Sequence, residues 1–293
     1  MVVDEKEISI TGRLLKTARL NAEYHECVLE PEPFIDQLKA HDSSAHIFTF
    51  LQEIPEEKPS FDYYHEKQGI SLVPLTTYEN WWKNQINVKT RNMVRKAGKK
   101  NVEIRTAEFD DDLVRGIMGI YDETPMRQGK VFIHYGKDFE TTRANHITFI
   151  ERSEFIGAYY EDELIGFTKL VHGRKHTSLM QIISMIKHRD KAPTNALIGK
   201  AIEVCAEKNV PYLHYGLWSR RGLGEFKRHH AFERFEIPRY FVPLTARGRM
   251  FLSLKLHHRP AEYVPEKWLD VLADRRTRWN IHRYRNHPSL SGR

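Results

Sequence analysis

The clearest hydrophobic pattern in the chain lies between Ser153 and Thr245. Three runs rich in β-branched and aromatic residues follow one another there, at Phe155–Tyr160, Leu164–Val171 and Thr177–Ile186. A three-residue acidic segment separates the first two runs, which is the spacing of a β-hairpin. The third run ends in a polar segment that extends from His188 to Asn195. The pattern therefore predicts three consecutive antiparallel strands.

A helical pattern follows that polar segment. Apolar residues recur three and four positions apart from Ala196 to Cys205, which indicates a helix with one buried stripe. Thr194 or Asn195 suits its N-cap. A short strand, a helix and two further strands are expected next, at Tyr212–Tyr215, Leu223–His230 and around Phe235–Pro243. This order predicts the α+β class, with a mixed, mostly antiparallel sheet flanked by helices.

The flanking parts of the chain show shorter patterns. Residues 1–75 mix short apolar stretches with proline-rich breaks, which predicts strands and one helix near Ile35–Ala40. We expect a long helix from Tyr78 to about Lys99, and further elements at Val102–Ala107 (strand), Phe109–Tyr121, Phe139–Ile150, Gly248–Leu256 and Pro265–Arg278 (helices). The tail from Asn286 is expected to be disordered.

These patterns divide the chain into three parts. Residues 1–77 form an N-terminal α+β part, which we interpret as a degenerate half-domain. Residues 78–245 form the core, and residues 246–293 form a basic helical extension. The C-terminal extension is basic: residues 247–293 contain eleven Lys or Arg residues and four Asp or Glu residues. Together with the net charge of +7, this favours an anionic partner.

Several classes of protein are disfavoured by what the sequence lacks. No apolar run approaches the roughly 18 residues that span a bilayer, and the N-terminus has no secretory pattern, so a cytoplasmic location is expected. The two cysteines, Cys27 and Cys205, stand in no metal-ligand spacing, and we expect no metal. No Ser/His/Asp order, HExxH or Walker A pattern is present, which disfavours hydrolases, metalloproteases and P-loop enzymes.

A set of short motifs resembles the GNAT acyltransferase superfamily, and more closely its FemAB-like branch, the peptidoglycan bridge-forming aminoacyltransferases. The motifs span residues 78–245 and appear in the family's order: Arg91–Ala97 with Val102–Ile104, Ile156–Tyr160 with Glu163–Phe167, Asn195–Ile198, Tyr212–Gly216, Leu223–Lys227 and His230–Phe232. The resemblance implies a GNAT-like fold and an acyltransferase.

One departure from the family pattern concerns the donor. GNAT enzymes carry a glycine-rich loop before the central helix, where backbone N–H groups hold the CoA pyrophosphate. The segment His188–Asn195 contains no glycine. FemAB-like members also lack a full version of this loop, because they accept an aminoacyl group from tRNA. Both donors therefore stay open, and we favour acyl-CoA.

Four residues are candidates for the chemistry, which needs a base for the attacking amine and a donor for the oxyanion. Lys227 lies in a Phe-Lys pair where Fem-type enzymes have a functional lysine. His214 and Tyr215 lie on the strand after the central helix, and strand alternation places only one of them on the active face. Glu225 lies on the next helix. The competing interpretations are that Lys227 is an ordinary exposed lysine and that Tyr215 is an ordinary buried tyrosine, neither with a catalytic role.

The carrier-binding candidates cluster before the central helix, where the helix N-terminus favours a phosphate. They are Ser184, His188, Arg189, Lys191, Thr194, Asn195 and, from the later helix, Arg228. A solvated turn with an ordinary N-cap is the competing interpretation.

The function predicted from the sequence is an N-acyltransferase that acts on an amine of a small-molecule or cell-envelope precursor, by direct attack in a ternary complex. An aminoacyl-tRNA-dependent transferase of the Fem type and a non-catalytic nucleic-acid-binding protein on the same scaffold are the alternatives. Fold-level analogy does not by itself decide among them.

Overall fold

One mixed sheet runs through the whole molecule. The computed structural model describes residues 1–41, 44–258 and 266–285, and within these residues eleven strands form the sheet. The order is β1 (Val2–Val3), β2 (Lys6–Thr11), β3 (Thr17–Leu20), β4 (Ile47–Leu51), β13 (Glu233–Pro243), β5 (His65–Pro74), β12 (Tyr212–Leu217), β11 (Thr177–Ser184), β10 (Glu163–His172), β9 (Ser153–Tyr160) and β6 (Glu103–Ala107). Only the β3–β4 and β11–β12 pairings are parallel among these neighbours. The predicted α+β class with a mostly antiparallel sheet is confirmed.

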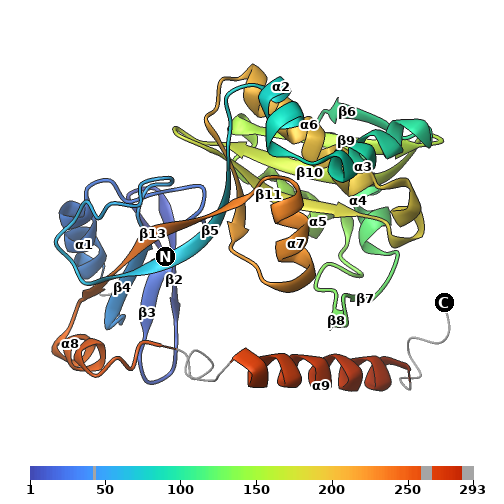
Figure 1. The fold of residues 1–293 in the computed structure, drawn as a ribbon. Helices are drawn as coiled ribbons and strands as arrows, with labels where there is room; N and C mark the ends of the chain where they lie inside the picture. The colour runs from blue at the N-terminus through green and yellow to red at the C-terminus, as the bar shows by residue number, and fades with distance from the viewer. Residues whose placement is uncertain (42–43, 259–265, 286–293) are drawn as a thin grey trace.

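Two lobes share this sheet, and the long strands β5 and β13 connect them (Figure 1). The smaller lobe holds β1 to β4 with helices α1 (Pro31–Ala40) and α8 (Ala246–Ser253). The larger lobe holds β12, β11, β10, β9 and β6 with the helices α2 (Tyr78–Asn80), α3 (Val88–Lys99), α4 (Asp111–Tyr121), α5 (Phe139–Ile147), α6 (Pro193–Glu207) and α7 (Arg221–His229). Because β13 pairs with both β4 and β5, the chain returns to the smaller lobe after completing the larger one.

The core of the larger lobe forms where α6 packs on the hairpin strands. Leu197, Ile198, Ala201, Ile202 and Cys205 on α6 are fully buried, as their three-and-four spacing predicts. They contact β10, which is buried along nearly its whole length. The predicted order of three antiparallel strands, central helix, strand and helix is therefore confirmed.

The core of the smaller lobe is aromatic. Phe34 of α1 stacks on Phe48 of β4, and Phe48 stacks on Phe50. Phe50 in turn stacks on Tyr240 of β13. Offset ring pairs of this kind add to the stabilisation that burial alone provides. The end of β13 thus completes a core whose other members come from the first 51 residues.

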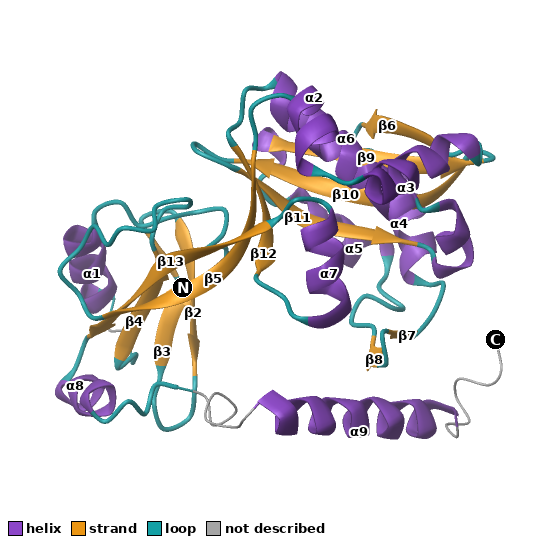
Figure 2. Ribbon diagram, viewed as in Figure 1, coloured by secondary structure: helices purple, strands orange, loops and turns teal. Residues whose placement is uncertain are grey.

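Helix α9 (Glu266–Arg285) lies beside the larger lobe, near the short pair β7 (Met126–Arg127) and β8 (Lys130–Val131) (Figure 2). It extends beyond the predicted end at Arg278, and α8 ends before the predicted Leu256. The tail from Asn286, expected to be disordered, falls outside the described residues. Each described helix is too short or too polar to cross a membrane.

Two further predicted elements differ from the structure. The helix expected from Tyr78 to Lys99 is divided by a π-helical turn at Trp81–Gln85, and a new helix begins where the Asn87 side chain accepts the N–H of Thr90. The two strands expected around Phe235–Pro243 are the single strand β13. Both errors arise because long-range pairing and local capping override hydrophobic periodicity.

The N-cap of α6 was also predicted wrongly. It is Ala192, with a left-handed φ of 57°, and Pro193 occupies the first helical turn. Proline suits that position because its fixed φ is helical and its missing N–H would have no helical partner there. Thr194 is consequently inside the helix, where its hydroxyl bonds another side chain.

Candidate functional site

The sheet opens between β11 and β12 in the larger lobe. These two parallel strands pair only at Thr177–Leu213 and Ser178–His214. Beyond that point β11 continues beside β10 to Ser184, while β12 stays with β5 and shifts register. Gly216 makes the bend of β12 with a φ of +61°, a conformation that favours glycine. Backbone groups of the two strands are therefore not paired with each other at this end of the sheet.

Lys227 of α7 reaches the end of β12 from inside the protein. Its ammonium lies 2.5 Å from the carbonyl oxygen of Tyr215, 2.7 Å from that of Leu217, and 3.2 and 3.3 Å from the hydroxyls of Ser71 and Ser219. The side chain is buried, and burial lowers its pKa to about 8. The ammonium has three N–H groups, and the four neighbouring oxygens are enough to accept a hydrogen bond from each of them. All four acceptors are uncharged. It fixes the end of β12 and leaves a positive charge there.

The Tyr215 side chain extends from the face of β12 that is covered by Lys227 of α7. The Lys227 ammonium is 4.5 Å from the centroid of the tyrosine ring, and the ring packs against Phe232 at 5.5 Å. Burial raises the pKa of Tyr215 to about 12, so the phenol stays protonated at neutral pH and is a proton donor. Lys227 and Tyr215 are the two predicted catalytic candidates that the structure brings together.

His214 faces the opposite side of the sheet. Its Nδ1 lies 3.2 Å from the Ser178 hydroxyl, and its ring packs against Tyr24 and His176. The imidazole is buried, and burial holds its pKa well below the usual range. Strand alternation thus separates His214 from Tyr215, as the sequence predicts.

Glu225 and Arg228 lie on the outer side of α7. Both are exposed, whereas Lys227 between them is buried. Neighbouring positions on a helix point in directions about 100° apart, so one turn cannot place all three side chains in the interior. The structure does not bring Glu225 to the Lys227–Tyr215 pair.

Ser184 and Thr194 meet at the start of α6. Their hydroxyl oxygens are 2.7 Å apart, and the carbonyl of Ser184 accepts a hydrogen bond of 2.8 Å from Arg127. Arg127 is paired with Glu123 at 2.9 Å. Neither Glu123 nor Arg127 was predicted from the sequence, since both lie some 60 residues before Ser184 and carry no motif.

The Glu123 carboxylate occupies the loop that precedes α6. It accepts the backbone N–H groups of Ile186 and Lys187, both at 2.7 Å. Two later amides are also committed: that of Ala192 donates to the carbonyl of Arg189, and that of Asn195 to the carbonyl of Ala192. Pro193 has no N–H to offer. These four amides are thus used within the protein and are not available to hold a pyrophosphate in the way that a glycine-rich loop does.

The other carrier-binding candidates point elsewhere. The His188 ring lies 5.5 Å from that of Tyr160, and the Lys191 ammonium lies 4.3 Å from the centroid of the same tyrosine ring. Both side chains therefore cover the turn of the β9–β10 hairpin, while Arg189 is exposed and Asn195 is half-buried. The structure brings together Ser184 and Thr194, but it does not place His188 or Lys191 beside them.

A second buried lysine was missed by sequence reasoning. Lys169 of β10 is fully buried, and its ammonium donates to the carbonyls of His146 and Thr148 at 2.7 and 2.5 Å. The hydroxyl of Tyr121 joins His146 Nε2 at 3.0 Å and accepts the amide of Gln181 at 2.7 Å. The signal was a charged residue within the otherwise apolar run Leu164–Val171.

No protein-family model and no curated protein matches this sequence. Solved structures do match the fold. FemX superposes with a TM-score of 0.60 at 10% identity, over 84% of this chain and 86% of FemX. The C-terminal domain of a putative lysylphosphatidylglycerol synthetase from Agrobacterium fabrum gives 0.57 at 13% identity, and L-PGS from Bacillus licheniformis gives 0.52 at 13%, each over 86% of both chains. The chain therefore has the FemAB-like, GNAT-type fold that its motifs resemble.

Proposed function

We propose that this protein transfers an acyl or aminoacyl group from a carrier to an amine. The observation that carries the proposal is the opening between β11 and β12, with the Lys227–Tyr215 pair at its edge. An extended donor arm that enters this opening can hydrogen-bond to the unpaired strand edge. The similarity of fold to FemX and to the lysylphosphatidylglycerol synthetase domains supports a transferase.

The proposed chemistry is direct attack. The amine nitrogen forms a bond to the donor carbonyl, the C–S or C–O bond to the carrier breaks, and the amine loses a proton to solvent. Tyr215, protonated at neutral pH, donates a proton to the departing sulfur or oxygen and regains one from solvent after the transfer. The positive charge of Lys227 stabilises the oxyanion that forms near the end of β12.

Acyl-CoA is the first candidate donor. Titration of the protein with acetyl-CoA and with longer acyl-CoAs, followed by calorimetry, tests it directly. Binding of one acyl-CoA per chain supports this donor, and Tyr215→Phe should then reduce turnover with little change in affinity. If none of these thioesters binds, the CoA form of the proposal is wrong.

Aminoacyl-tRNA is the second candidate, and the loop before α6 favours it. The Glu123 carboxylate occupies the amides of Ile186 and Lys187, and Pro193 has no N–H, so these three positions offer no donor to a pyrophosphate, a group that an aminoacyl ester does not carry. Binding of tRNA whose affinity falls steeply with salt supports this donor. Absent or salt-insensitive binding contradicts it.

A non-catalytic nucleic-acid-binding role rests on the basic residues of 247–293. Deletion of residues 247–293 separates this role from acyl transfer. If the deletion removes RNA or DNA affinity and leaves acyl transfer intact, nucleic-acid binding belongs to residues 247–293 and transfer to the rest of the chain. Unchanged affinity removes the non-catalytic role.

For the acceptor amine we propose a small molecule or a cell-envelope precursor. Mass spectrometry of a co-purified ligand would identify it.

A further inference from the structure

Two histidines and a glutamate meet in the smaller lobe, away from the Lys227–Tyr215 pair. Glu66 lies on β5, and His257 and His258 lie just after α8. The Nε2 atoms of His257 and His258 are 3.0 and 3.1 Å from the same carboxylate oxygen, Oε1 of Glu66. One ligand atom from each residue falls within 4.8 Å of the other two. These three side chains form what we call the Glu66 cluster.

The donor set of the Glu66 cluster suits a borderline transition metal. Imidazole nitrogen and carboxylate oxygen bind Zn²⁺ at about 2.0–2.2 Å, so two ligand atoms in a tetrahedral site lie roughly 3.3 Å apart. The two measured nitrogen–oxygen distances are within a few tenths of an ångström of that value. Small side-chain rotations would therefore place all three atoms around one ion.

Burial of His257 also needs an explanation. Its side chain is only 3% exposed, and its Nδ1 atom is buried without a hydrogen-bond partner among the described residues. The rings of Tyr64 and Phe241 pack against it at 5.8 and 4.8 Å. Burying an imidazole with one nitrogen unsatisfied costs free energy, which a bond from the other nitrogen to a metal would offset.

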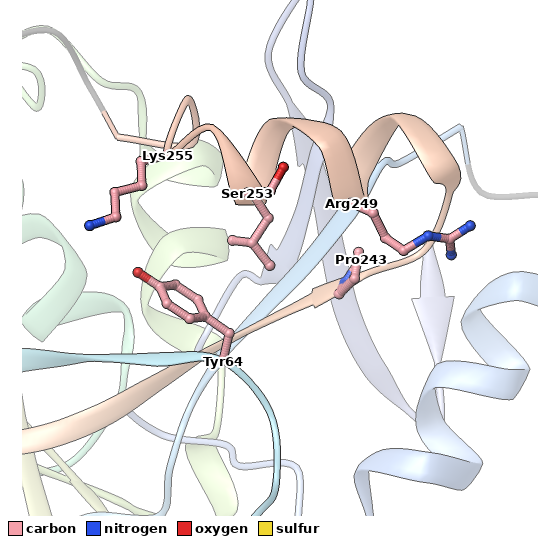
Figure 3. A pocket seen from close by; sticks show the side chains of 6 residues that line it. Tyr64, Pro243, Arg249, Ser253 and Lys255 are labelled. Atoms are coloured by element: carbon pink, nitrogen blue, oxygen red, sulfur yellow. The ribbon is translucent and has the colours of Figure 1, made fainter.

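The Tyr64 side chain orients the carboxylate and also faces a neighbouring cleft. The Tyr64 hydroxyl donates to Oε1 of Glu66 at 2.7 Å, which is the kind of outer contact that holds a ligating carboxylate in place. Tyr64 also lines a cleft of about 350 Å³, together with Pro243, Arg249, Leu252, Ser253 and Lys255 (Figure 3). In this view the Tyr64 hydroxyl and the Lys255 ammonium lie on the same side of the cleft, and Arg249 points away from them.

We propose that the Glu66 cluster binds one divalent transition-metal ion of the Zn²⁺ class and ties the segment after α8 to β5. Both Nε2 atoms coordinate the ion, and the imidazole protons then reside on Nδ1. The site is independent of the transfer chemistry, and its failure would leave the proposed function untouched.

The test is zinc binding by the full chain. Protein stripped with a chelator and dialysed is titrated with ZnSO₄ by calorimetry, and bound zinc is counted by elemental analysis after desalting. We expect one zinc per chain and a higher melting temperature with zinc than without it. Failure of the wild-type protein to bind zinc would overturn the proposal.

Variants locate the site. The double substitution His257→Ala and His258→Ala should abolish binding, and Glu66→Gln, which keeps an acceptor for Tyr64, should weaken it by more than about 100-fold. His41→Ala is the control, because His41 is an exposed histidine of the same lobe. Circular dichroism verifies that each variant is folded. Zinc affinity in the double variant equal to that of wild type would assign the metal to other residues and overturn the proposal.

Discussion

The two lobes bury different chemistry. In the larger lobe the described interior includes two lysines and three histidines: Lys169, Lys227, His146, His214 and His230. The described interior of the smaller lobe is dominated by stacked aromatic rings, with Thr49 and Gln52 buried among them and the His257 side chain buried just after α8. Gln52 is fully engaged, with Nε2 bonded to the carbonyls of Glu56 and Lys58 and Oε1 bonded to Tyr240.

This difference separates a scaffold from a site. An aromatic core stabilises through burial and ring packing, and nothing in it titrates near neutral pH. Buried lysines and histidines lower stability unless other contacts compensate, and their shifted pKa values make them candidates for charge stabilisation or proton transfer. The proposed transfer chemistry uses residues of the larger lobe, and the smaller lobe is joined to it through β5 and β13.

Substitution of the two buried lysines tests this comparison with the largest expected effect. Lys227→Met should reduce transfer about 10²–10³-fold, because it removes the positive charge beside the end of β12. Lys169→Met is the matched control. It leaves two buried carbonyl groups unsatisfied, and each should lower the free energy of unfolding by roughly 1–3 kcal/mol. Turnover per folded molecule should not change. Turnover with the identified donor and urea unfolding measure the two outcomes. Equal loss of turnover in both variants would contradict a special role for Lys227.

The next effect concerns the junction between the lobes. Arg239 of β13 makes a two-point ion pair with Glu23 at 2.7 and 2.9 Å, and the two side chains are only 14% and 11% exposed. Arg239→Met leaves the Glu23 carboxylate uncompensated and should lower the free energy of unfolding by about 2–4 kcal/mol.

A control for that variant is available on the same strand. Arg234 pairs with Glu236 at 2.9 Å, but the two side chains are 51% and 34% exposed. Arg234→Met should therefore cost less than about 1 kcal/mol in the same urea experiment. Similar losses for the two variants would show that the junction does not depend on the buried pair.

A third effect is a pH dependence of the larger lobe. Burial lowers the pKa of both His146 and His230 from 6.5 to about 4. Between these values the unfolded chain binds protons that the folded protein does not, so stability falls as pH drops from 6.5 to 4. Each histidine contributes a slope of about 1.4 kcal/mol per pH unit within that window.

Hydrogen exchange at pH 7 and pH 5 measures where this loss occurs. Amides of α5 and β10 should lose protection at pH 5 before amides of β4, and His146→Gln should reduce the slope measured by urea unfolding. Simultaneous loss of protection in both lobes, with an unchanged slope in the variant, would contradict the assignment to the larger lobe.

Much of the larger lobe was predictable because its elements are local. The hairpin β9–β10 and the stripe of α6 follow from alternation and helical spacing, which need only neighbouring residues. The start of α6 was misplaced because Pro193 fixes the first turn more strongly than Thr194 or Asn195 caps it. The division of the helix from Tyr78 was also missed, since a π-helical turn leaves the apolar periodicity nearly intact.

The candidate site was predictable in part. Lys227 and Tyr215 were named from motifs, and strand alternation separated Tyr215 from His214. Glu225 was placed beside Lys227 in sequence but lies on the outside of α7, because consecutive helical positions diverge. The partners Glu123, Arg127 and Lys169 were missed, since their contacts join residues with no spacing pattern between them.

The sequence by itself determined the hairpin β9–β10, the buried stripe of α6 and the class of fold, because hydrophobic periodicity acts over a few residues. Only the tertiary structure decided which atoms meet. It placed the Glu123 carboxylate on the amides of Ile186 and Lys187, closed the smaller lobe with β13, and brought Glu66 to His257 across 191 positions of chain. Such contacts depend on how the sheet is ordered, and no local pattern records that order.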